Sequence, residues 1–208
     1  MTQAPPKAQP ENPLPQRRPR ADSQRNEEAV LEAAKCVFAT SGVDAPVREI
    51  AARAGLGIGT LYRHFPNRSD LIAAVFRREV DACAEEAQRL AAEHPPGEAL
   101  MRWLHRYTAF IATKRGLAAA LHSGDPAFDA LPAYFQAHFE PALGALLAAA
   151  TATHEIRPDV APYDLLRAIG NLSTASGADG ADHTRRMVGL LLDGLRYGAG
   201  APPPKAAP

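Results

Sequence analysis

The chain has little of what builds a disulfide-stabilised, strand-rich or membrane-spanning protein. Its 208 residues include two cysteines, Cys36 and Cys83, which are too few for a disulfide scaffold, and we expect both to be reduced thiols. Strand-forming residues are sparse and alanine is abundant, which favours helix throughout. No signal sequence opens the chain and no apolar run is long enough to span a bilayer. We expect an all-α protein that stays in the cytoplasm and contacts no membrane.

The chain also lacks the short motifs of common catalytic and cofactor-binding sites. It contains no P-loop, no GxGxxG and no nucleophile elbow. Two of its seven histidines stand four residues from a carboxylate, His94 from Glu98 and His183 from Asp179, which is too few ligands for a metal site. The glycines at 55, 57 and 59 belong to a turn and do not form a phosphate cradle after a strand. We therefore expect no enzyme activity, no metal and no cofactor.

Pro-rich segments at both ends enclose a helical region. Residues 1–22 are predicted to be a disordered basic arm and 199–208 a disordered tail. Helical periodicity predicts a three-helix unit at 23–68 and a larger body at 69–198. The nine expected helices cover roughly 24–41, 46–53, 57–64, 69–92, 97–114, 116–121, 130–153, 162–174 and 182–197.

The most informative stretch is 47–65, where Gly55 separates two short amphipathic segments, a pattern typical of helix-turn-helix. Leu61 and Phe65 stand at i and i+4 on one face of the second segment and can bury together. The other face carries a hydroxyl, a guanidinium and an imidazole, from Thr60, Arg63 and His64. Such a set suits an element that lies in the DNA major groove and contacts phosphates and base edges.

Four motifs in order carry a resemblance to a known family. They are V-L-E-A-A-x-x-V-F from residue 30, E-I-A-x-x-A-G from 49, G-T-L-Y-R-H-F from 59 and N-R-x-x-L from 67. Together they resemble the N-terminal DNA-binding domain of the TetR (tetracycline repressor) family of bacterial transcription regulators. The run at 114–121 is similar to the subgroup with an SbtR-like C-terminal domain.

The resemblance implies a homodimeric repressor that binds double-stranded DNA at a palindromic operator and is released by a small molecule. It implies that Thr60, Tyr62 and His64 contact DNA, that Arg63 reaches base edges and that Arg68 holds a phosphate at the start of the fourth helix.

The chain departs from the family where Gly57-Ile58 replaces a frequent Ser-Lys. Ile58 either packs inward with Leu61 or contacts a thymine methyl group. The basic arm either compensates by following phosphates or is a solvated tail.

Aromatic stripes mark the body. Trp103, Tyr107 and Phe110 recur at helical spacing, as do Phe135, His138 and Phe139. Stripes of this kind are usually core, but in the family helices four to eight together enclose a ligand cavity. These six residues and Asn171 are therefore candidates for a pocket that holds a small, largely apolar ligand. Two alternative functions stay open. One is an enzyme with His138 as its base, and the other is a regulator whose body binds a protein partner or no ligand.

The last helix carries more apolar surface than one stripe needs. Val188, Leu192 and Leu195 can pack on the body. The remaining apolar and glycine positions, together with one face of the preceding helix, predict a two-fold interface. Its residues are Leu165, Ala168, Leu172, Met187, Leu190, Leu191 and Gly194.

Overall fold

The computed structural model describes residues 18–115, 123–173 and 180–196. These residues form eight α-helices and one 3-10 turn and contain no strand, which confirms the all-α prediction. The sixth expected helix, at 116–121, lies outside the described residues. The elements are α1 (Arg18–Ser41), α2 (Val47–Arg53), α3 (Ile58–His64), α4 (Arg68–Glu93), α5 (Pro96–Arg115), η1 (Pro126–Phe128), α7 (Leu131–Ala152), α8 (Pro162–Leu172) and α9 (Gly180–Arg196).

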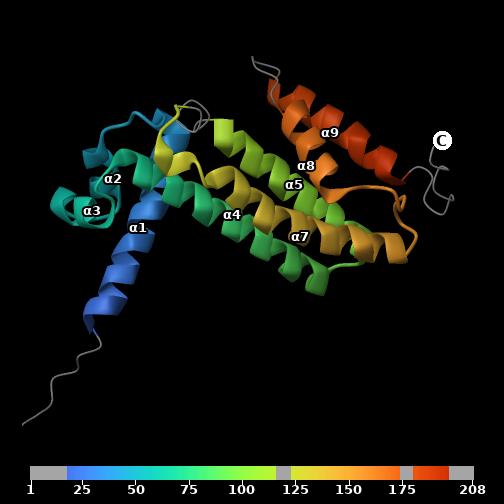
Figure 1. Cartoon of the computed structure of the whole chain (residues 1–208), viewed down its shortest axis with the longest axis horizontal. Helices are drawn as coiled ribbons and strands as arrows, with labels where there is room; N and C mark the ends of the chain where they lie inside the picture. Colours follow the sequence, from blue (N-terminus) through green and yellow to red (C-terminus); the bar gives the residue numbers. More distant parts are fainter. Residues whose placement is uncertain (1–17, 116–122, 174–179, 197–208) are drawn as a thin grey trace, which may run out of the picture.

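The helices form a head and a body that share α4. In Figure 1, α1, α2 and α3 cluster at one end of the molecule, and α4 runs from this head along the body. α4 packs against α5 and α7 in the body and against α1 in the head. α8 packs on α7 and carries α9, so these two helices lie on the side of the body away from α4 (Figure 1).

The first helix is longer than predicted. α1 begins at Arg18, so the expectation of a disordered arm as far as residue 22 is wrong for residues 18–22. Pro19 lies in the first turn, where its missing N–H has no helical partner to lose. The guanidinium of Arg25 also pairs with Asp22 one turn earlier, at 2.7 Å. The composition of residues 18–22 predicts disorder, because composition alone contains no information about local contacts within a helix.

A glycine turn separates α2 from α3. Gly55 has a φ of 69°, in the left-handed region that glycine tolerates. Its N–H donates to the carbonyl of Ala52 at 3.1 Å, and the N–H of Leu56 donates to the carbonyl of Ala51 at 3.0 Å. This pair of bonds is the Schellman arrangement that ends a helix and turns the chain. The turn fixes the direction in which α3 leaves α2.

Both cysteines are free, as expected. Cys36 is half-buried in α1 and Cys83 is fully buried in α4. Burial raises the pKa of the Cys83 thiol to about 12, so this thiol is protonated and unreactive at neutral pH.

None of the helices described between residues 18 and 196 combines the length and apolarity needed to cross a membrane.

Candidate nucleic-acid interface and body cavity

α3 is held on the head by its apolar face. Leu61 is 1% exposed and Phe65, which ends the helix, is also buried. Both belong to the same core as Val30, Ala34 and Ile50 of α1 and α2. The predicted burial of the i, i+4 pair is confirmed. Because α3 is anchored from one side, its opposite side faces solvent with a defined orientation.

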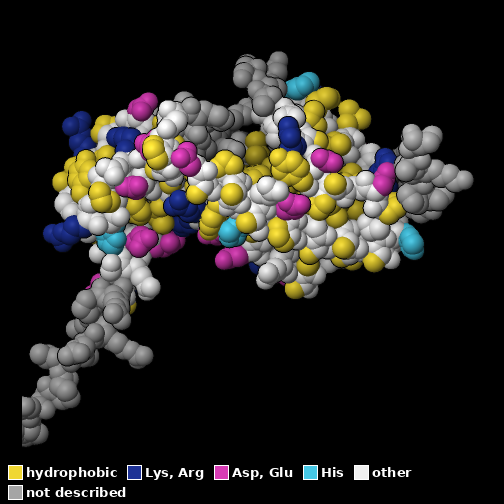
Figure 2. Space-filling model, viewed as in Figure 1, with side chains coloured by type: hydrophobic (Ala, Val, Ile, Leu, Met, Phe, Trp, Pro, Cys, Tyr) yellow, Lys and Arg dark blue, Asp and Glu magenta, His cyan; other side chains and the backbone are white. Residues whose placement is uncertain are grey.

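The outward face of α3 presents the predicted set of side chains. Ile58 and Tyr62 are 48% and 47% exposed, unusual values for large apolar side chains. Arg63 is exposed, and Thr60 and His64 are half-exposed. The interpretation that Ile58 packs inward is therefore wrong. Figure 2 shows Lys and Arg side chains around the end of the molecule that holds α2 and α3. This face combines apolar, hydrogen-bonding and cationic groups on one short helix.

Arg68 has a structural partner that its motif did not reveal. It is the first residue of α4, it is half-buried, and its Nη1 donates to the backbone carbonyl of Val43 in the α1–α2 connection. The guanidinium therefore fastens this connection to α4. Arginine has five N–H donors, so one bond to Val43 leaves others for a phosphate. The phosphate contact of Arg68 stays a prediction. Its bond to Val43 is a structural role that the motif did not predict.

The aromatic stripes of α5 and α7 meet in the centre of the body. Trp103, Tyr107 and Phe139 are each no more than 1% exposed. The Trp103 and Tyr107 rings stack with centroids 5.7 Å apart, and Phe139 meets both edge-on. Phe110 and Phe135 close the cluster, each with a ring against Phe139. Five of the seven predicted ligand-binding residues therefore pack against one another as core.

The polar atoms of this cluster are also satisfied within the chain. The Trp103 indole donates to the carbonyl of Cys83 at 2.8 Å, and the Tyr107 hydroxyl donates to the carbonyl of Leu166 at 3.2 Å. Burial raises the pKa of Tyr107, which keeps this hydroxyl protonated. Asn171 is exposed on α8 and does not join the aromatic cluster. The structure thus separates two predicted pocket residues, Asn171 and His138, from the other five.

A cavity of about 580 Å³ lies between α4 and α7, and His138 is on its wall. Its floor is mainly alanine, with Leu146 and Pro141. Its polar groups come from Asp81, Glu85 and Gln88 of α4 and from Tyr134 and His138 of α7. No carboxylate of α4 is among the predicted site residues. The signal for them was their i, i+4 spacing, which places Asp81 and Glu85 on one face of α4.

Asp81 organises the polar wall of this cavity. The Tyr134 hydroxyl donates to its Oδ1 at 2.6 Å, and the His138 Nε2 lies 3.6 Å from the same atom. His138 stacks on the Tyr134 ring at 4.1 Å, and its Nδ1 lies 2.8 Å from the Tyr134 carbonyl. Burial, and then the hydrogen bond to Asp81, raise the pKa of Tyr134 to about 12. The wall therefore carries one carboxylate held by a neutral phenol, beside a second carboxylate from Glu85.

α9 divides into an inner and an outer face as its periodicity predicts. Val188, Leu192 and Leu195 are 2%, 3% and 5% exposed, which confirms that this stripe packs on the body. On the outer face Leu190 is 66% exposed, Gly194 is exposed, and Met187 and Leu191 are half-buried. On α8, Ala168 and Leu172 are half-buried. Leu165 is 3% exposed within a single chain and belongs to its core.

Comparison with known proteins agrees with this architecture. The family model of bacterial regulatory proteins, tetR family, matches residues 30–75, and that of the transcriptional regulator SbtR-like, C-terminal domain, matches residues 95–197. A TetR transcriptional regulator from Streptomyces coelicolor is 39% identical, with a TM-score of 0.70 over 82% of this chain and 98% of that chain. The chain belongs to the TetR family. A second TetR regulator, from Mycobacterium vanbaalenii, is 36% identical, with a TM-score of 0.66 over 86% of this chain and 99% of that one.

The predicted family and its SbtR-like subgroup are therefore both confirmed, and the protein is a TetR-family helix-turn-helix transcription regulator. TetR proteins are regulators, a class distinct from enzymes. A curated relative, an HTH-type transcriptional regulator of Staphylococcus aureus (strain USA300), is 40% identical over 63 residues, or 30% of this chain. This match spans about a third (34%) of that relative. Within the described residues of the TetR fold, no three His, Cys, Asp or Glu side chains are placed to hold a metal ion.

Proposed function

We propose that this TetR regulator binds a palindromic operator as a homodimer and is released from it by a small molecule. The observation that carries the proposal is the outward face of α3, where large apolar and cationic side chains stand exposed on a helix anchored from behind. Exposed groups of this kind cost solubility unless they meet a partner. A helix of this shape and chemistry fits the major groove.

The proposed contacts divide by chemistry. Arg63 is the candidate for bidentate recognition of guanine, and Ile58 for contact with a thymine methyl group. Thr60, Tyr62 and His64 supply hydroxyl and imidazole groups to phosphates and base edges. Arg68 is proposed to hold a phosphate while its bond to Val43 keeps it in position.

The dimer is proposed to form through the outer face of α9 and the adjoining face of α8. Leu190 is the most exposed large apolar residue among those described, and Met187, Leu191 and Gly194 lie beside it on the same helix. Ala168 and Leu172 of α8 extend this surface. A two-fold axis makes such a patch self-complementary and places two α3 helices on one duplex.

The ligand is proposed to bind in the cavity between α4 and α7, because the aromatic cluster behind it is already filled. The cavity has an apolar surface made of alanines, Leu146 and Pro141. Negative charge on one wall comes from Asp81 and Glu85. These groups suit a small molecule with an apolar body and a cationic amine. Since α4 forms one wall and also continues into the head, a ligand that prefers one position of α4 shifts the distance between the two heads.

A competition experiment tests the DNA assignment. Arg63→Ala should lose about 1–3 kcal/mol of discrimination at one base position of a duplex selected with the wild type. Arg185→Ala is the matched control, because Arg185 is an exposed arginine on α9 that pairs with Asp182 of its own helix. Equal discrimination by the wild type and Arg63→Ala would refute the proposed role of α3.

A further inference from the structure

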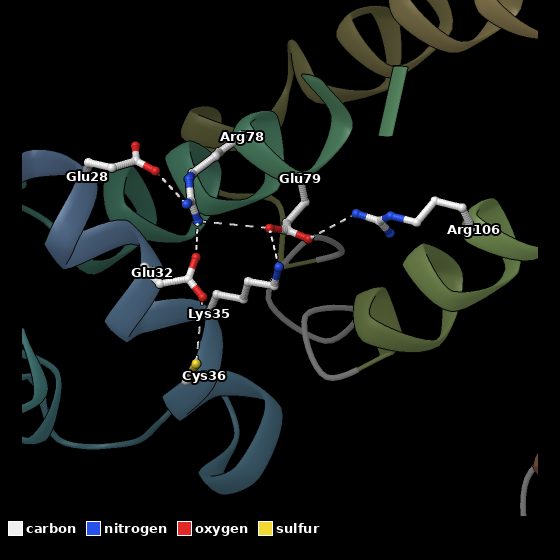
Figure 3. Close-up of polar contacts among 7 residues, drawn as sticks. All are labelled: Glu28, Glu32, Lys35, Cys36, Arg78, Glu79 and Arg106. Atoms are coloured by element: carbon white, nitrogen blue, oxygen red, sulfur yellow. Dashed lines mark hydrogen bonds and ion pairs between the residues drawn. The ribbon is translucent and has the colours of Figure 1, made fainter. Parts of the chain in front are cut away.

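Glu79 is the one charged residue that is buried among those the structure describes. Its side chain is 8% exposed, at the place where α4 leaves the head and enters the body. Figure 3 shows its carboxylate between two cations that come from opposite sides. Lys35 of α1 places its Nζ 2.8 Å from Oε1, and Arg106 of α5 places its Nη2 3.8 Å from Oε2. One oxygen therefore faces the head and the other faces the body.

A buried carboxylate is costly unless cations and hydrogen bonds compensate for lost water. The cations that compensate Glu79 come from two parts of the molecule, Lys35 from the head and Arg106 from the body. The contact with Lys35 is within hydrogen-bonding distance, whereas the contact with Arg106 is longer than a hydrogen bond. A displacement of α5 against α4 by about 1 Å is therefore enough to make or to lose the Arg106 contact.

The neighbouring residue strengthens the link to the head. Arg78 also lies on α4, and its guanidinium pairs with Glu28 at 2.5 Å and with Glu32 at 2.8 Å, both on α1. Its Nη1 lies 4.0 Å from the Glu79 carboxylate (Figure 3). Five charged residues thus connect α1 with α4, and Arg106 adds α5 to the same cluster.

We propose that Glu79 is the positioning residue through which α5 of the body controls how firmly α1 of the head is held on α4. Movement of α5 that separates Arg106 from Oε2 leaves the buried carboxylate with fewer cations to compensate for its lost water, and the attachment of α1 to α4 weakens. The inference rests on the proposed function, because it supplies the step between the body and the DNA-binding head.

Amide hydrogen exchange of the free full-length protein tests this link without DNA. Arg106→Gln removes the cation from the body side and keeps a polar side chain. Arg102→Gln is the matched control, because Arg102 lies on the same helix, is 54% exposed and pairs with Glu98 of its own helix. We expect the α1 amides near Lys35 to exchange about fivefold faster in Arg106→Gln, the lower end of typical coupling between sites, and to be unchanged in Arg102→Gln. Unchanged α1 exchange in Arg106→Gln overturns the proposal.

A double-mutant cycle with operator affinity as readout tests the role of the carboxylate itself. Arg106→Gln should alter affinity for a selected duplex about fivefold in the wild-type background and much less in a Glu79→Gln background. Equal effects in both backgrounds overturn the proposal. If Glu79→Gln does not fold, Lys35→Gln replaces it in the cycle, because the Lys35 side chain is 34% exposed, and additive effects then overturn the proposal. If no duplex is selected at all, the proposed function fails, while the exchange experiment still decides whether Glu79 links α5 to α1.

Discussion

The indole of Trp103 donates a 2.8 Å hydrogen bond to the backbone carbonyl of Cys83, which joins α5 to α4 at the centre of the body. Trp103 also stacks on Tyr107, whose hydroxyl reaches α8 at Leu166. Buried polar groups of this kind need partners, and both find them inside the chain. The aromatic stripes therefore form a core shared by α4, α5, α7 and α8, and the proposed ligand cavity lies outside it.

Trp103 is the single tryptophan, so its fluorescence reports on this core directly. Since Trp103 is fully buried, we expect a blue-shifted emission maximum and weak quenching by acrylamide in the free protein. Trp103→Phe should lower the free energy of unfolding by about 1–3 kcal/mol, because the hydrogen bond from the indole to α4 is lost and the smaller ring leaves space. Tyr163→Phe, at an exposed position of α8, is the control. Strong quenching in the free protein would show an open pocket in place of a core.

Leu190→Glu should convert the proposed dimer to a folded monomer. Leu190 is 66% exposed in a single chain, so the variant keeps its own core, but a dimer would bury an unpaired charge at a cost of about 3–5 kcal/mol. Arg185→Glu is the control, because it adds negative charge on another side of α9. Light scattering at micromolar concentration is the measurement. A monomeric wild type would contradict the dimer.

Two helix ends with the same hydrogen bonds should respond oppositely to substitution. Gly55 after α2 and His154 after α7 both have positive φ, at 69° and 58°, and both take part in Schellman bonds. Gly55→Ala should destabilise the protein by about 1–2 kcal/mol. No atom lies within 4 Å of the added methyl group, so this cost comes from the backbone alone. His154→Gly should stabilise it by about 0.5–1 kcal/mol. Urea unfolding measures both, and a loss of stability in His154→Gly would contradict the account.

The pair between Glu32 and Arg78 should make the attachment of the head depend on pH. The hydrogen bond from Arg78 holds the pKa of Glu32 below its usual value of 4.5. A lowered pKa in the folded state means that the pair stabilises the protein above pH 4.5, and that this contribution is lost as the pH falls through the lowered value. The stability difference between wild type and Glu32→Gln should therefore shrink between pH 6 and about pH 3. Glu27→Gln, an exposed neighbour on α1, is the control, and a difference that is constant with pH would contradict the assignment.

The head could be predicted from the sequence because its signals are local. The turn at Gly55 ends α2 through the bond from Gly55 to Ala52 and the bond from Leu56 to Ala51, and Leu61 and Phe65 share a face by spacing alone. The inner and outer faces of α9 follow from the same periodicity. The orientation of Ile58 does not follow from spacing, because a glycine-rich turn sets where α3 begins, and the structure shows the side chain exposed.

The body's cavity could not be predicted because its residues come from distant segments. Spacing placed Trp103 and Tyr107 on one face of α5, but it did not show that carbonyl groups of α4 and α8 accept their hydrogen bonds. It did not show that Asp81 of α4 meets Tyr134 of α7. Contacts of this kind depend on how the helices pack, and periodicity fixes only which residues share a face.

In vitro selection from random duplexes with the full chain tests whether two α3 helices of a dimer bind one operator. We expect an inverted repeat whose half-sites are separated by about 34–36 Å or a multiple of this distance, because two α3 helices must reach successive major grooves on one side of the duplex. We further expect Arg63→Ala to select the same repeat with one base position relaxed. No enrichment over random duplexes, or an enriched single half-site bound by one chain, would contradict a dimer that binds DNA through α3.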